Sequence, residues 1–216
     1  MAGVPLLSSS GSGRMAGVPL LSSSGNGRTA FMENRPRKTR RAWNEPGHAH
    51  YLTYSCYRRL PLLACDRVRR WVVEAFQRTR EDLDVALWAY VIMPEHIHVL
   101  LHPRGARCEM RRILAALKQP VAKAARLWLE EQGQRAWLER LTVVYPSRRV
   151  FRLWQPGGGF DHNVFREKTV PAIVDYIHAN PVRRELVEQP TDWEWSSARF
   201  WDRWSDVPLR MDDPLG

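Results

Sequence analysis

The chain of 216 residues is long enough for one domain with a sizeable core and terminal extensions. No apolar run approaches the length of a membrane span, and the first residues lack the basic start and long apolar core of a secretory signal. The net charge is +10, and only four of the 33 basic residues are lysine. Such an arginine excess favours contacts with nucleic-acid phosphates, although some basic proteins have no nucleic-acid partner.

Cysteine usage indicates the compartment. Cys56, Cys65 and Cys108 are few, widely spaced and odd in number, which argues against a disulfide framework and against a zinc site. We therefore expect a reducing, cytoplasmic location, associated with the bacterial nucleoid if the partner is DNA.

The chain begins with a tandem repeat. Residues 1–14 (MAGVPLLSSSGSGR) recur as residues 15–28, with Asn26 in the place of Ser12. Two copies rich in serine and glycine cannot bury a core, so we expect a disordered leader and not a solenoid. Met32 is a second possible start of translation, and we assign no function to the repeat.

A basic arm follows at residues 35–41 (RPRKTRR). A solvated tail would explain this segment, but the basic character of the whole chain favours an arm that follows DNA phosphates. Its candidate DNA contacts are Arg37, Lys38, Arg40 and Arg41. We predict a leader at residues 1–42, a folded domain at 43–205 and a C-terminal tail at 206–216.

Hydrophobic periodicity in the folded domain predicts strands and helices in alternation. The strands are expected at residues 50–57, 85–93, 96–102 and 149–154. The helices are expected at residues 66–81, at 107–131 with a bend around Pro120, and at 167–180, stopping at Asn180–Pro181. Residues 132–145 are ambiguous and are assigned to a helix end and a loop. The order of elements matches a ferredoxin-like βαββαβ core, an α+β fold with an antiparallel sheet, followed by one extra C-terminal helix.

Two histidines share one face of the strand expected at 96–102. Alternate side chains of a strand point to the same side, so His96 and His98 face one way while Ile97 and Val99 face the core. Two imidazoles on one strand face can converge on a single divalent ion. Ordinary core or surface histidines remain the alternative.

The H-x-H pattern is short, and His48-Ala49-His50 fits it too. We discount this second pair as a metal site. It follows Pro46–Gly47 in what reads as the entry from a loop, and the alanine at its centre would anchor nothing in a core.

The helix expected at 167–180 carries a tyrosine beside its buried stripe. The stripe consists of Val170, Ile173, Val174 and Ile177. Tyr176 and Asn180 fall on one flank of it and His178 falls on the other. Most partly buried tyrosines are structural, and a phenol is a weak nucleophile at neutral pH. Attack on a phosphodiester would need an electrophile polarised by a metal, which the histidine face would supply.

Several segments together resemble the HUH single-strand DNA transposases, in which a bulky hydrophobic residue separates two histidines. Residues 90–98 (YVIMPEHIH) resemble the HUH motif. The tyrosine-helix region resembles one branch, the REP-associated tyrosine transposases, which act on repetitive extragenic palindromes. Its matching segments are residues 154–155 (WQ), 161–162 (DH), 174–183 (VDYIHANPVR) and 192–197 (DWEWSS). The resemblance spans residues 43–201.

The resemblance implies a site and a reaction. His96 and His98 would bind Mg²⁺ or Mn²⁺ with Asn180 as third ligand, and Tyr176 would cut single-stranded or hairpin DNA through a 5′-phosphotyrosine intermediate. The resemblance also implies that the protein carries out DNA transposition as a monomer or a homodimer. We add Arg183 and Arg184 as candidate DNA contacts. Glu185 stands where the family leads us to expect glycine, and would be slightly strained at positive φ.

Two other functions stay open. One is a domesticated protein that binds DNA palindromes or hairpins without cutting them. The other is a metal-dependent phosphohydrolase that uses water and does not need Tyr176.

Overall fold

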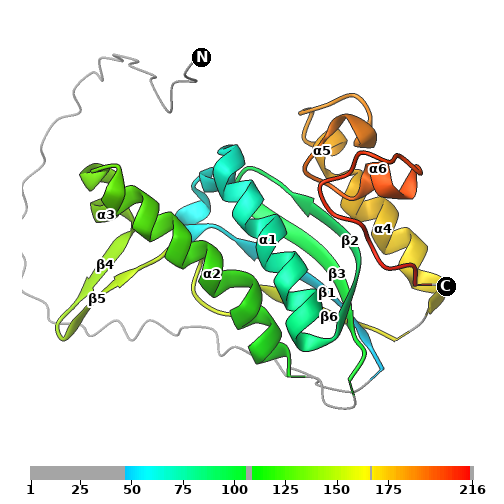
Figure 1. Ribbon diagram of the computed structural model, residues 1–216, viewed down its shortest axis with the longest axis horizontal. Coiled ribbons are helices and arrows are strands. Elements are labelled where there is room, and N and C mark those ends of the chain that lie inside the picture. Colours follow the sequence, from blue (N-terminus) through cyan, green and yellow to red (C-terminus); the bar gives the residue numbers. More distant parts are fainter. Residues whose placement is uncertain (1–46, 106–108, 166, 215–216) are drawn as a thin grey trace, which may run out of the picture. The chain divides into compact units, whose positions relative to one another are not determined.

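The computed structural model describes residues 47–105, 109–165 and 167–214. Its centre is a four-stranded antiparallel sheet in the order β2-β3-β1-β6, shown in Figure 1. The strands are β1 (Ala49–Ser55), β2 (Val85–Ile92), β3 (His96–Pro103) and β6 (Phe160–Val164). With helices α1 (Asp66–Leu83) and α2 (Met110–Glu131), they follow the βαββαβ order. The predicted α+β class with an antiparallel sheet is therefore confirmed.

The two faces of the sheet are covered by different helices. Ile97, Val99 and Leu101 of β3 belong to the larger core cluster with residues of α1 and α2. Leu100 points to the other face and packs in a second cluster with α4 (Val170–His178). The alternation predicted for the histidine strand is thus confirmed, because one face of β3 is wholly apolar and the other carries His96 and His98.

The fourth strand was predicted in the wrong place. Residues 149–154 contain β5 (Arg148–Phe151), which pairs with β4 (Thr142–Tyr145) in a separate hairpin. The sheet takes β6 as its fourth strand instead. The stronger apolar pattern of the earlier segment was misleading, because β6 is a short edge strand with a mixed sequence, FDHNV. The assignment of residues 132–145 was also wrong, since they form α3 (Arg135–Leu141) and β4.

The chain continues in helical turns beyond the tyrosine helix. Pro181 does not end the helical region as predicted, because it stands in the first turn of α5 (Asn180–Arg183). Another short helix is α6 (Ala198–Trp201). The 3-10 turns are η1 (Tyr57–Arg59), η2 (Leu62–Ala64), η3 (Glu167–Thr169) and η4 (Pro190–Asp192).

The C-terminal segment packs beyond residue 205, where the sequence placed the start of a tail. Leu209 and Met211 are buried in the larger core cluster. The Asp212 carboxylate accepts a hydrogen bond from the Leu87 backbone at 2.9 Å and pairs with Arg80 at 3.1 Å. Across the described residues, no helix is long and apolar enough to cross a membrane.

Candidate functional site

The histidine pair lies at the start of β3, where the two imidazoles converge. The Nε2 atoms of His96 and His98 are 3.0 Å apart. The far nitrogen of each ring has oxygen partners. His98 Nδ1 is 2.6 Å from the Tyr51 hydroxyl and 2.8 Å from that of Thr53, and His96 Nδ1 is 3.1 Å from the Glu95 carboxylate. A proton on each Nδ1 satisfies these partners and leaves both Nε2 lone pairs free to bind a cation.

Burial keeps both imidazoles neutral. Desolvation, with a smaller contribution from the neighbouring His96, lowers the pKa of His98 to about 3. Desolvation also lowers the pKa of His96; Glu95 acts against this shift, whereas the charges of Arg184 and Arg59 add to it. Burial raises the pKa of Glu95, but the hydrogen bond from Arg184 and the nearby His96 outweigh burial and hold that pKa below its usual range. The pair therefore presents neutral nitrogen ligands beside an ionised carboxylate.

Tyr176 of α4 lies against His98 of this pair. Its ring centroid is 6.0 Å from that of His98 and 6.2 Å from that of Tyr51, in edge-to-face contacts. The Arg183 guanidinium carbon lies 5.1 Å from the Tyr176 ring centroid. The tyrosine side chain is 43% exposed, so a large ligand can reach it. Tyr176 and His98 thus meet within one chain.

The donor set of the residues present fits a divalent cation. Two imidazole nitrogens that lie 3.0 Å apart could both bind one such ion. The described residues contain no cluster of three or more His, Cys, Asp or Glu side chains placed to hold a metal. Within this described part of the chain, a third protein ligand would come from another residue type.

Asn180, the predicted third ligand, lies at the junction of α4 and α5. Its side-chain nitrogen donates to the carbonyl oxygens of Tyr176 at 2.8 Å and Ile177 at 3.3 Å. These bonds fix the amide against the last turn of the tyrosine helix. They use the nitrogen, so the amide oxygen is the atom with which Asn180 would bind a metal.

No protein-family model matches the sequence, and no curated protein does. Among solved structures, a REP-associated tyrosine transposase bound to a REP hairpin aligns with a TM-score of 0.57 at 21% identity, over 82% of this chain and 95% of that one. The chain has the fold of this REP-associated tyrosine transposase. A Deinococcus radiodurans protein provisionally assigned as a transposase aligns at 18% identity over 64% of this chain and 93% of its own, but its TM-score of 0.37 is too low to add to the argument.

The residues predicted to contact DNA fall into two groups. Arg183 and Arg184 both reach the site, the first over Tyr176 and the second through an ion pair with Glu95 at 2.7 Å. The arm residues Arg37, Lys38, Arg40 and Arg41 lie outside the described residues. Glu185 has φ of +55°, the conformation that the sequence analysis associated with strain at this position.

The pair His48–His50 is not part of the site, but only part of the reasoning for discounting it was right, since His48 alone lies in the loop before β1. Ala49 is buried in the second core cluster, and His50 lies within β1 and not in a loop. The His50 side chain is fully buried and pairs with Asp161 at 2.9 Å. Strand alternation places it on the face opposite Tyr51.

Three residues of the site were missed by sequence reasoning. Tyr51 and Thr53 alternate along β1 on the histidine side of the sheet, and Glu95 directly precedes His96. The alternating pattern of residues 50–57 (HYLTYSCY) indicates that Tyr51 and Thr53 share one face of the strand. Which residue of β3 they contact depends on the strand register, which the pattern does not give. Such partners of metal-binding histidines fix the tautomer and the orientation of the ring.

His178 is excluded from the site, as the helix geometry predicted. Its Nε2 lies 2.8 Å from the Ser197 hydroxyl, and burial lowers the pKa of His178 to about 4.

The His178 imidazole binds a proton near pH 6.5 in the unfolded chain but only near pH 4 in the folded protein. The free energy of unfolding should therefore depend on pH. Full stability is expected above about pH 6.5, with a loss on the order of 3 kcal/mol as the pH falls through this window. Urea unfolding at pH 7 and pH 4.5 should show a smaller pH dependence for His178→Gln than for wild type. Equal pH dependence would contradict the assignment.

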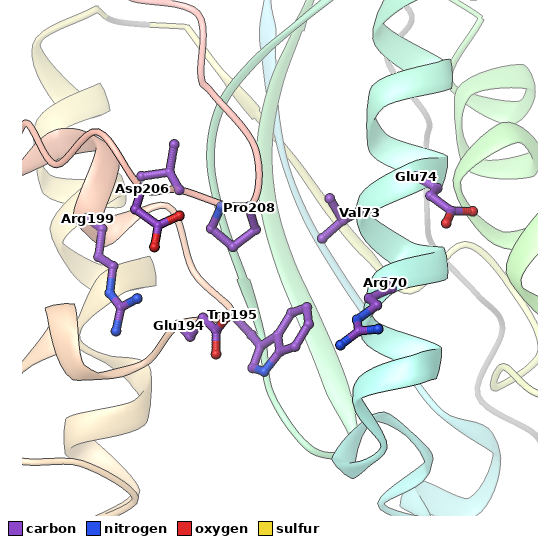
Figure 2. A pocket seen from close by; sticks show the side chains of 9 residues that line it. Arg70, Val73, Glu74, Glu194, Trp195, Arg199, Asp206 and Pro208 are labelled. Atoms are coloured by element: carbon purple, nitrogen blue, oxygen red, sulfur yellow. The ribbon is translucent and has the colours of Figure 1, made fainter. Parts of the chain in front are cut away.

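A cavity of about 370 Å³ is lined by other residues, which Figure 2 shows. It is lined by α1 residues such as Arg70 and Glu74 and by C-terminal residues such as Trp195 and Arg199. Its lining mixes both charges and contains none of the histidines or the exposed tyrosine. The histidine pair and Tyr176, on β3 and α4, therefore form a group separate from this cavity.

Proposed function

We propose that this protein is a transposase-like DNA strand transferase that cuts single-stranded or hairpin DNA through a covalent bond to Tyr176. The observation that carries the proposal is the contact of the exposed Tyr176 with His98, whose Nε2 converges with that of His96. A water-using phosphohydrolase would have no need of a tyrosine in this position. The fold shared with a REP-associated tyrosine transposase supports the same conclusion.

The proposed step is a transesterification that balances without an added energy source. The Tyr176 oxygen forms a bond to the scissile phosphorus, and the bond from phosphorus to the 3′-oxygen breaks. The phenol proton leaves to solvent, and the departing 3′-oxygen takes up a proton. The DNA 5′-phosphate stays esterified to the tyrosine, so the reverse reaction with another 3′-hydroxyl joins strands without ATP.

His96, His98 and the amide oxygen of Asn180 would hold Mg²⁺ or Mn²⁺, which supplies Lewis-acid polarisation of the phosphate when bound. The chain's own residues do the positioning. Tyr51 and Thr53 fix the His98 ring, and Glu95 fixes the His96 ring while Arg184 anchors Glu95. Arg183 places a positive charge against the tyrosine ring, close to where the phosphate must lie.

The solved transposase with this fold is bound to a REP hairpin. We propose hairpin DNA as the substrate class for this chain as well. The net charge of +10 suits such a partner, since phosphate neutralisation would release counterions.

Replacing Tyr176 by phenylalanine is expected to abolish the covalent adduct and leave hairpin binding nearly unchanged, because only the nucleophilic oxygen is lost. The measurement is denaturing gel electrophoresis after incubation with labelled hairpin DNA, carrying single-stranded flanks, and Mn²⁺. Tyr145→Phe is the matched control, since Tyr145 is a similarly exposed tyrosine, 38% accessible, on the separate hairpin.

The three candidate functions predict different results in this experiment. Wild type and Tyr145→Phe should both form the adduct. Cleavage that survives Tyr176→Phe would identify a hydrolase. Binding without any wild-type adduct would identify a hairpin-binding protein that does not cut.

A further inference from the structure

A turn with unusual backbone geometry lies next to the histidine pair. Arg58 and Arg59 have φ of +54° and +53°, and both side chains are exposed. The left-handed region is rare for residues that carry a side chain, and glycine, asparagine and aspartate are its usual occupants. Two successive arginines there indicate a use for the side chains that offsets the strain.

The turn is held against the strand end that carries the metal-binding candidates. The Cys56 backbone donates to the carbonyl of Glu95, the residue before His96, at 2.8 Å. The Arg58 backbone donates to the Gln155 side-chain oxygen at 3.1 Å. Fixed from both sides, the turn is held beside the strand end that carries the histidines.

Within the described part of the chain, neither guanidinium is paired with a carboxylate. Among the salt bridges of the described residues, none involves Arg58 or Arg59, whereas Arg184 is paired with Glu95. The Arg58 guanidinium carbon rests 5.1 Å from the ring centroid of Tyr57. Arg59 is close enough to His96 to lower the pKa of that imidazole, after the larger effect of burial. The turn thus offers two available cations at the edge of the candidate site.

We propose that Arg58 and Arg59 bind backbone phosphates of the DNA strand next to the scissile phosphate. The inference rests on the proposed function and adds the binding site that holds the strand over His98 and Tyr176. Guanidinium groups match phosphate oxygens in a bidentate geometry, and contacts of this kind position a strand without reading its sequence.

The decisive variant is Arg58→Gly/Arg59→Gly, because glycine relieves the backbone strain and removes the charges. Its thermal midpoint is expected to equal or exceed that of wild type. Its affinity for a fluorescein-labelled DNA hairpin with a single-stranded 5′ extension should fall about tenfold or more at low salt. The salt dependence of log K should weaken by about 0.7 for each lost single-strand phosphate contact. Anisotropy titrations in EDTA measure binding without cleavage.

Arg203→Gly is the matched control. Arg203 is an exposed arginine with φ of +63° on the turn after α6, so glycine relieves the same kind of strain there. This variant should bind the hairpin like wild type. Arg58→Asn/Arg59→Asn, which keeps a residue tolerant of the left-handed region, should bind as weakly as the glycine variant.

Three results would overturn the inference. If both double variants bind with wild-type affinity and salt dependence, the turn is structural, and the proposed function stands without it. If both bind weakly but also unfold at lower temperature, the loss belongs to folding. If wild type itself does not bind the hairpin, the proposed function fails together with the inference.

Discussion

Replacing His98 by glutamine is expected to lower Mn²⁺-dependent cleavage of hairpin DNA by a factor on the order of 10²–10³ while hairpin affinity stays within about twofold. His98 is the more buried of the two histidines, and two hydroxyls hold its far nitrogen. Glutamine has a comparable size but cannot present a fixed nitrogen lone pair toward His96. The loss should therefore appear in the chemical step and in the Mn²⁺ concentration needed for half-maximal rate.

The control for this variant is His102→Gln. His102 lies on the same face of β3 four residues further along, where its ring stacks on Trp88 at 5.1 Å. Its replacement should leave the rate and the Mn²⁺ dependence unchanged. Wild-type cleavage by His98→Gln at saturating Mn²⁺ would contradict the ligand assignment. Thermal unfolding of both variants without metal separates a folding defect from a catalytic one.

Much of the candidate site was predictable because it depends on local geometry. Strand alternation places His96 and His98 on one face, and helical spacing places Tyr176 beside the buried stripe of α4. The same rules exclude His178, which is bound to Ser197. These conclusions need only the periodicity of one element at a time.

The residues that support the site could not be predicted in this way, because their partners are distant in the sequence. Thr53 reaches His98 only because the register of β1 on β3 sets these two residues opposite each other. Glu95 and Arg184 are separated by 89 positions, and their contact depends on how α5 packs near the start of β3. Backbone periodicity carries no information on such pairings.

The error in the fourth strand has a similar physical origin. Strand propensity largely reflects burial against neighbours, and an edge strand has a neighbour on one side only. β6 pairs with β1 alone, and its mixed sequence therefore gives only a weak strand signal. What places β6 is the glycine before it, which lets the chain approach β1 closely.

Gly159→Ala is expected to destabilise the protein by about 2–4 kcal/mol, lowering the thermal midpoint by roughly 5–10 °C. Gly159 has φ of +78°, and an added Cβ would lie 2.1 Å from the Thr53 carbonyl oxygen and 3.0 Å from the Tyr54 Cα. Both are backbone atoms of β1, so no side-chain rotation can relieve the clash. Strand β6 must move away from β1 instead.

Gly133→Ala separates the two causes of this loss. Gly133 also has positive φ, +62°, but an added Cβ there meets nothing within 4 Å. Its replacement should show only the conformational penalty, about 1 kcal/mol. The excess loss in Gly159→Ala then measures the close approach of β6 to β1, and equal losses would show that this contact is unimportant. Because Thr53 also holds His98, the Gly159 variant should need more Mn²⁺ for cleavage, whereas the Gly133 variant should not.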